Sequence, residues 1–170
     1  MLRRISMTQN VLVFNFNKKS DIRNWMIVDD RVMGGKSSGN FELTDEGYGK
    51  FRGEISLENN GGFSSVRYFT SPIAIVNHSE IILRIKGDGK RYQFRIKETT
   101  SQRHSYVTYF QTSGKWETLR IELKDLIPKF RGRQLDIPNF SSDFVSEIGF
   151  LFGNKKVEPF QLLVDKIELR

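Results

Sequence analysis

Residues 80–97 read EIILRIKGDGKRYQFRIK, and this stretch is the clearest indication of the fold class. One set of alternate positions is apolar, namely Ile81, Leu83, Ile85, Tyr92, Phe94 and Ile96. The other set is mainly basic, with Arg84, Lys86, Arg91, Arg95 and Lys97 beside Gln93. Alternation with a period of two is typical of half-buried strands, and the turn at residues 87–89 predicts a β-hairpin with one apolar face and one basic face.

Short segments with strand-like patterns recur along the chain. We expect further strands at residues 11–16, 50–57, 63–69, 105–111, 116–123, 146–152 and 160–169, and residues 40–43 are also strand-like. The apolar parity changes around Asp165, which predicts a β-bulge. Residues 20–24 could form one helical turn, and residues 126–140 are expected to be a long irregular connection. About ten short strands with regular turn signals predict an all-β, antiparallel jelly-roll β-sandwich.

Length and composition bound the organisation of the chain. Its 170 residues fit one domain, which we place at residues 10–170 after a flexible segment at residues 1–9. The chain has no cysteine, which suits a reducing compartment, and no apolar run approaches the roughly 20 residues of a membrane helix. A net charge of +7 favours anionic partners, although it equally suits a basic domain with scattered charges.

Two glycine pairs mark candidate functional loops. The first lies in WMIVDDRVMGGKS at residues 25–37, and the second lies in NGGFSSVR at residues 60–67. These two motifs resemble those of the complex I intermediate-associated protein 30 (CIA30) family, whose domain begins with a Trp, an Asp and a Met-Gly-Gly-x-Ser run. A Gly-Gly-Phe-x-Ser-x-Arg segment follows in that family, and its Phe-Arg-Gly element is matched by residues 130–132.

The resemblance implies a fold, a function and a site. It covers nearly the whole chain and implies a galactose-binding-domain-like sandwich. It also implies a non-catalytic, chaperone-like domain that binds another protein, an assembly intermediate of respiratory complex I. We expect a cytoplasmic bacterial protein, or a mitochondrial one if the source is a eukaryote. The implied binding residues are Trp25, Asp29, Asp30, Met33, Gly34, Gly35, Ser37, Gly61, Gly62, Phe63, Ser65 and Arg67.

The predicted basic hairpin face offers a second candidate surface. Its residues are Arg84, Lys86, Arg91, Arg95 and Lys97, to which the basic loop adds Arg131. Basic residues beside Tyr106 or Tyr109 would suit an anionic or carbohydrate ligand, so a carbohydrate or small-ligand binding module is the alternative function. The same residues also suit a solvated outer sheet face, and nucleic acid is not expected as a partner.

Catalytic patterns are present only in fragments. Residues 35–39 fit G-x-S-x-G, but that pattern needs a strand that turns into a helix, and residues 40–43 are strand-like. Gly35, Lys36 and Ser37 also match the end of a phosphate-binding loop, although Asp30 stands where its first glycine should be. The dinucleotide-binding motif G-x-G-x-x-G is incomplete at Gly87, because Tyr92 stands at the position of its third glycine. We therefore expect no enzyme.

Metal and carboxylate chemistry is equally weakly indicated. Two histidines and no cysteine exclude an ordinary zinc site. A structural calcium on Asp29, Asp30 and Asp165 stays open, but capping of the glycine loop, with a partner such as Arg31 or Arg67, is the favoured role for the first two. Asp29 and Glu54 could be cast as the two catalytic carboxylates of a hydrolase, but nothing in their spacing favours that role. Trp25 and Trp116 are expected to be packing aromatics rather than sugar platforms, and no cofactor is expected.

Overall fold

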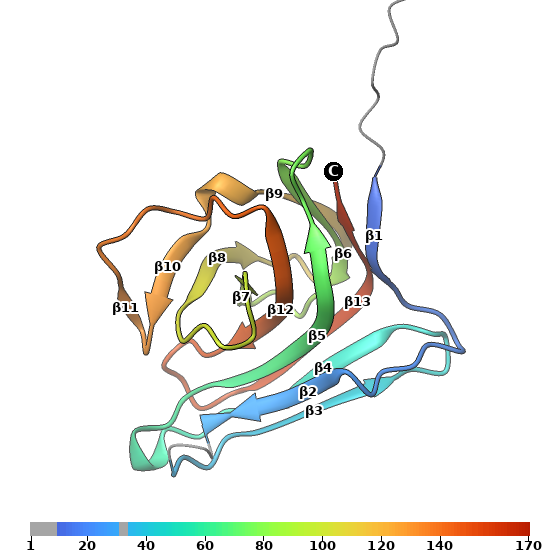
Figure 1. Ribbon diagram of the computed structural model, residues 1–170. Helices are drawn as coiled ribbons and strands as arrows, with labels where there is room; N and C mark the ends of the chain where they lie inside the picture. The colour runs from blue at the N-terminus through green and yellow to red at the C-terminus, as the bar shows by residue number, and fades with distance from the viewer. Residues whose placement is uncertain (1–9, 31–33) are drawn as a thin grey trace, which may run out of the picture.

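The structure, a computed structural model, describes residues 10–30 and 34–170, which form two antiparallel sheets packed against each other (Figure 1). The first sheet has the order β3-β4-β13-β6-β9, with β1 paired to β13 beside this path. Its strands are β1 (Val11–Asn15), β3 (Ser38–Leu43), β4 (Gly49–Glu54), β6 (Glu80–Lys86), β9 (Trp116–Glu122) and β13 (Pro159–Leu169). The predicted all-β, antiparallel class is confirmed.

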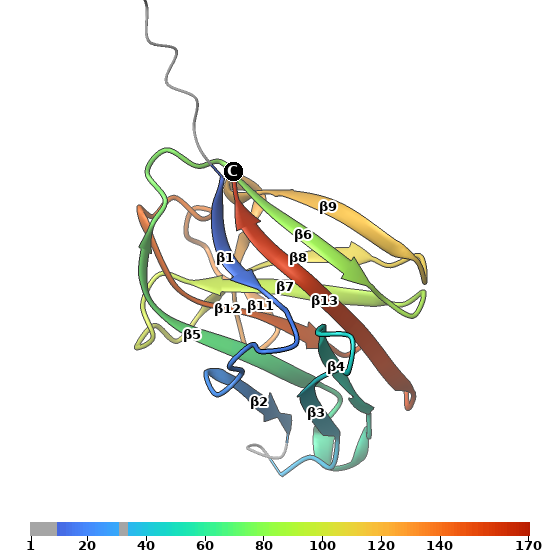
Figure 2. The same cartoon turned by 90° about the vertical axis from the view of Figure 1, so that its right-hand side faces the viewer.

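The second sheet has seven strands in the order β11-β10-β8-β7-β12-β5-β2. These are β2 (Trp25–Asp29), β5 (Ser64–Ala74), β7 (Arg91–Lys97), β8 (Ser105–Gln111), β10 (Ile127–Phe130), β11 (Arg133–Gln134) and β12 (Phe144–Phe152). Figure 2 shows β1, β13, β6 and β9 in front, with β5, β12, β7 and β8 behind them. Two short 3-10 turns lie at Glu58–Asn60 and Leu123–Asp125.

The core lies between the sheets, on the parity that the alternation predicts. Tyr92, Phe94 and Ile96 of β7 are at most 1% exposed, and so are Leu83 and Ile85 of β6. Strands β2 and β3 lie side by side (Figures 1 and 2). An aromatic stack closes the sandwich at this place. Its centre is the Trp25 ring, whose centroid is 5.0 Å from that of Phe41 and 4.9 Å from that of Tyr68.

The predicted hairpin at residues 80–97 is wrong. Strand β6 pairs with β13 and β9, whereas β7 pairs with β12 and β8, so the turn between them crosses from one sheet to the other. The side chain of Thr112 fixes this crossing, because its Oγ1 donates to the Lys90 carbonyl (2.7 Å) and accepts from the Gly89 N–H (3.0 Å). The basic residues of the two strands therefore lie on opposite outer faces of the sandwich.

The connection at residues 126–140 is more regular than expected. Strand β10 pairs with β8, and a tight turn at Arg131 and Gly132 leads into β11, with Phe130 opposite Arg133. Both turn residues have positive φ, 51° and 78°, as the commonest two-residue hairpin turn requires. At residues 20–24 the chain makes a turn closed by the Trp25 N–H and the Ile22 carbonyl. The predicted bulge is confirmed by a register shift between Val164 and Lys166.

Candidate functional site

The first glycine motif is built around a buried carboxylate at the end of β2. Asp30 is 0% exposed, and its Oδ1 accepts the Ser37 N–H (2.9 Å). Its Oδ2 accepts the Ser37 hydroxyl (2.5 Å) and the N–H groups of Gly62 (2.6 Å) and Phe63 (3.4 Å). Asp30 thereby ties both glycine motifs to the end of β2.

Asp30 also explains two of the glycines. A Cβ atom at Gly35 or at Gly61 would overlap the Asp30 carboxyl group, so both positions must lack a side chain for the loops to close over it. Burial by itself would raise the pKa of the Asp30 carboxyl, but the hydrogen bonds from Ser37, Gly62 and Phe63 outweigh burial and lower it. The carboxylate therefore stays ionised at neutral pH.

Several predicted motif residues are structural. The Ser37 hydroxyl is also bonded to both the backbone carbonyl (3.1 Å) and N–H (2.9 Å) of Ser56, and the Ser65 hydroxyl donates to the Val28 carbonyl. Asp29 and Trp25 are buried as well. The loop-capping role expected for Asp30 is confirmed, although its capping partners are backbone groups and Ser37 rather than Arg67. Met33 and Arg31 lie outside the described residues.

A groove of about 580 Å³ is hollowed into the outer face of the seven-stranded sheet. Gln93, Val107 and Leu151 belong to its central strands, and the second glycine motif contributes Gly61, Gly62 and Phe63. Its basic residues are Arg67, Arg95, Lys97, Arg103, Lys129, Arg131 and Lys155. Of the first glycine motif, no described residue from Gly34 to Ser37 lines it. The groove is thus formed by the second motif, Arg67 and part of the predicted basic set.

The groove is strongly positive. It has seven basic side chains, and among the residues that the structure describes no Asp, Glu or His lines it. Burial, together with the neighbouring Arg67, lowers the pKa of the Arg95 guanidinium to about 10. Burial also lowers the pKa of Lys97, although Glu147, whose Oε2 lies 4.0 Å from its Nζ, opposes the shift. The Arg95 guanidinium therefore still carries its positive charge at neutral pH.

Tyr109 is the exposed aromatic residue of the groove, with 39% of its surface accessible. The Arg91 guanidinium lies 4.5 Å from its ring centroid and the Lys129 ammonium lies 4.9 Å from it. Lys129 Nζ also donates to the Tyr109 hydroxyl (3.0 Å). Both cations thus lie within the distance at which the negative face of an aromatic ring attracts a positive charge.

The basic set predicted from the hairpin is split by the fold. Arg95, Lys97 and Arg131 line the groove, and Arg91 reaches it over Tyr109. Arg84 and Lys86 lie on the other sheet, where Arg84 pairs with Asp165 (3.6 Å). Sequence reasoning missed Arg103 and Lys155, which come from loops and carry no periodic signal.

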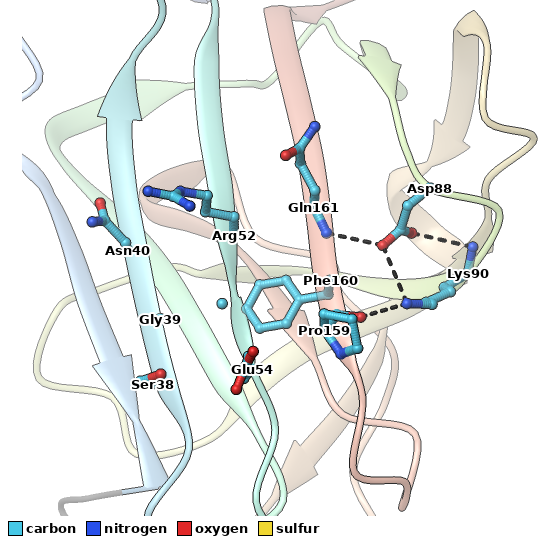
Figure 3. Close-up of a pocket in the computed structure, with 11 residues that line it drawn as sticks. Ser38, Gly39, Asn40, Arg52, Glu54, Asp88, Lys90, Pro159, Phe160 and Gln161 are labelled. Atoms are coloured by element: carbon cyan, nitrogen blue, oxygen red, sulfur yellow. Dashed lines mark hydrogen bonds and ion pairs between the residues drawn. The ribbon is translucent and has the colours of Figure 1, made fainter.

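A second hollow of about 670 Å³ lies on the first sheet, between β3, β4, β13 and the β6–β7 turn (Figure 3). Its charges are balanced, because Glu54 and Asp88 accompany Arg52 and Lys90. Asp88 is engaged there by the Gln161 N–H (2.9 Å), and Lys90 donates to the Pro159 carbonyl. None of the predicted motif residues lines this hollow, so the groove on the seven-stranded sheet is the better candidate site.

The remaining candidates for chemistry are dispersed. Asp29 is buried on the second sheet, while Glu54 lies in the hollow of the first sheet. Asp165 is on β13 with Arg84, and no group of three or more His, Cys, Asp or Glu side chains among the described residues could hold a metal ion. Trp116 packs on Tyr48, with ring centroids 4.6 Å apart. The described residues include no helix that is long and apolar enough to cross a membrane.

The architecture defines the class of protein as a jelly-roll β-sandwich of the kind found in carbohydrate-binding modules. The chain superposes on the family 11 carbohydrate-binding module of the Clostridium thermocellum cellulase Lic26A-Cel5E with a TM-score of 0.71 and 17% identity, over 96% of this chain and 95% of that one. A complex of the family 11 module from Clostridium thermocellum with a β-1,3-1,4-mixed-linked tetrasaccharide gives the same score, with 96% of each chain covered.

Within that class, the chain belongs to the complex I intermediate-associated protein 30 (CIA30) family, whose model matches residues 14–164. It is 23% identical to the mouse (Mus musculus) mitochondrial complex I intermediate-associated protein 30, over 98% of this chain. The chain spans 58% of the length of that mouse protein. The resemblance expected from the two glycine motifs is therefore confirmed.

Proposed function

We propose that this chain is a non-catalytic binding domain that holds a partner protein in the groove of the seven-stranded sheet. The observation that carries the proposal is that two family-like segments, residues 61–63 and residues 130–132, line the same groove although they are far apart in the sequence. The name of the mouse relative supports an intermediate of respiratory complex I as the partner.

The state of the polar groups supports a binding role without catalysis. Ser37 and Asp30, the candidates for chemistry in the first motif, are buried and bonded to each other and to the backbone. A two-carboxylate glycosidase would need carboxyl groups across a cleft, whereas the described lining of the groove has none. For the compartment we propose the bacterial cytoplasm, or the mitochondrion in a eukaryotic source, which agrees with the absence of cysteine.

Quantitative affinity capture from the native source tests this function. The unmodified chain should enrich complex I subunits or assembly factors, and the double variant Lys129→Glu, Arg131→Glu should lose that enrichment, because both residues line the groove. The double variant Lys115→Glu, Lys124→Glu makes the same change of charge at exposed positions outside the groove and should keep it. Equal capture by both double variants would contradict the proposal.

A carbohydrate ligand is the second candidate. It is favoured by the exposed ring of Tyr109 beside the polar Gln93 in the groove, and by the tetrasaccharide that the family 11 module binds. Titration calorimetry with the same mixed-linked tetrasaccharide should then show saturable binding that Tyr109→Ala removes. An absence of heat at millimolar saccharide would exclude this glycan as the ligand.

A further inference from the structure

The strand register places two arginines in one row across the outer face of the seven-stranded sheet. Gly149 of β12 is paired with Arg67 of β5 on one side and with Arg95 of β7 on the other. Side chains at paired positions point to the same face, and adjacent strands lie about 4.8 Å apart. Gly149 has no side chain, so a small cavity of about 10 Å³ lies between the two arginines, and both arginines also line the groove.

Glycine is required at the centre of this row by its surroundings. A Cβ atom at Gly149 would approach the Val66 carbonyl oxygen to 2.5 Å, well inside the normal contact distance. The sequence thus keeps position 149 free of a side chain, and the guanidinium groups of Arg67 and Arg95 share the space above it.

The two guanidinium groups lie in an excess of positive charge. Within residues 10–30 and 34–170 neither makes an ion pair or a hydrogen bond, and each guanidinium has five N–H donors to satisfy. Among the described residues Glu147 is the carboxylate that lines the small cavity with them, and this buried group attracts both Lys97 and Arg95. Three cations around one carboxylate leave an excess of positive charge in a partly buried groove, which an anionic ligand would relieve.

We propose that the Arg67–Gly149–Arg95 row is a carboxylate-binding subsite for an acidic segment of a partner protein. This inference rests on the proposed function and names the chemistry of the partner. Guanidinium groups bind carboxylates in a two-pronged geometry, and two of them in one row of the sheet, both lining the groove, can hold one carboxylate between them.

The rest of the groove selects a peptide over an acidic sugar. Val107 and Leu151 are buried beside the row, and Phe63, Phe130 and Leu57 add apolar surface around it. Apolar side chains next to a glutamate or aspartate would cover this surface, whereas the hydroxyl groups of a uronic acid would lose water against it. The preferred ligand is therefore a segment in which acidic and apolar residues alternate.

Fluorescence anisotropy with the full chain tests the subsite. The probe is a fluorescein-labelled peptide of four glutamates alternating with leucines, capped at its C-terminus, and the comparison peptide has glutamine in place of each glutamate. We expect the glutamate peptide to bind and the glutamine peptide not to bind. Arg67→Gln and Arg95→Gln should each weaken the binding roughly ten- to a hundredfold, the effect of losing a charge-assisted pair.

The controls separate this proposal from a structural role and from the proposed function. Arg120→Gln, on the other sheet, should leave the affinity unchanged, and Arg95→Lys should retain part of it because the charge remains. Equal affinity of the two peptides, or binding of oligogalacturonate but not of the peptide, would overturn the proposal. If Arg67→Gln and Arg95→Gln leave capture of complex I proteins intact, the subsite fails and the proposed function stands. If the peptide binds and no such protein is captured, the subsite stands and the proposed function fails.

Discussion

Asp30 is fully buried, and its two carboxylate oxygens accept four hydrogen bonds from three residues. The Asp30 backbone makes two more hydrogen bonds. Its N–H donates to the Phe63 carbonyl (3.2 Å), and its carbonyl accepts from the Gly35 N–H (2.8 Å). A buried carboxylate is costly unless such bonds compensate for lost hydration. Because the bonds compensate, the first glycine motif acts as a clamp that positions the second motif at the groove.

The first prediction concerns the stability that Asp30 supplies. The pKa of its carboxyl is lowered in the folded protein, so its contribution is complete above the ordinary pKa near 4 and is lost as the pH falls through the folded value. Asp30→Asn should reduce the free energy of unfolding at pH 7 by about 2–4 kcal/mol, because the amide leaves buried N–H donors without an acceptor.

Urea unfolding at a series of pH values from 7 to 3 measures this effect. The difference between the unmodified chain and Asp30→Asn should shrink toward low pH, since protonation removes the advantage of the carboxylate. Asp45→Asn, at an exposed turn position, is the control and should leave the curve unchanged. A loss for Asp30→Asn that stays constant down to pH 3 would show that charge has no part in the clamp.

At the scale of elements, the crossing between β6 and β7 decides the topology. Gly87 passes so close to Thr112 that a Cβ atom at position 87 would overlap its side chain, and Thr112 is only 4% exposed. On the far side of the turn, Asp88 accepts the Gln161 N–H of β13 (Figure 3). The turn is therefore held by residues from both sheets.

The second prediction is that the Thr112 hydroxyl stabilises this crossing. Thr112→Val keeps the shape of the side chain but leaves the Gly89 N–H and the Lys90 carbonyl without their partner, which should cost about 1–3 kcal/mol. Thr112→Ser keeps the hydroxyl and should cost less. Guanidinium unfolding measures both variants, and a Thr112→Ser that is less stable than Thr112→Val would refute the role of the hydroxyl.

Alternation predicted which side chains enter the core, but it could not predict which sheet each strand joins. The period of two is a local property, so it placed Tyr92 and Phe94 correctly. The sheet that β7 joins depends on contacts with Thr112 and Gln161, which are distant in the sequence. The strand β10 was missed because Pro128 is a strong turn signal, although an edge-proximal strand tolerates it.

The candidate site was predictable only in its separate parts. The glycine motifs and the basic residues were visible in the sequence, and Phe63, Arg67, Arg95 and Arg131 do line the groove. Their meeting depends on the register of β5, β12 and β7, in which Gly149 joins Arg67 to Arg95. No spacing along the chain reveals that register, because the three residues lie on separate strands.

At the scale of the whole molecule, the fold gathers basic residues that are scattered along the sequence at one groove. The sequence has a net charge of +7 with basic residues throughout, yet seven cations meet at one groove without a carboxylate in its described lining. On the other sheet several basic residues are paired, as Arg84 is with Asp165 and Arg52 with Glu42 (3.4 Å). The groove therefore concentrates the positive potential, which attracts anions and speeds their encounter.

The third prediction is that a small oxyanion stabilises the folded protein through the groove. Sulfate compared with chloride at equal ionic strength should raise the melting temperature of the unmodified chain more than that of the double variant Arg67→Gln, Arg95→Gln. At tenfold the dissociation constant the binding contributes about 1.4 kcal/mol, or about 3–6 °C for a chain of this size. The general stabilising effect of sulfate acts on both proteins and cancels in the comparison. Differential scanning fluorimetry measures the shifts, with Arg84→Gln, Arg120→Gln as the matched variant on the other sheet. Equal sulfate shifts in all three proteins would show that the positive charge of the groove binds no oxyanion.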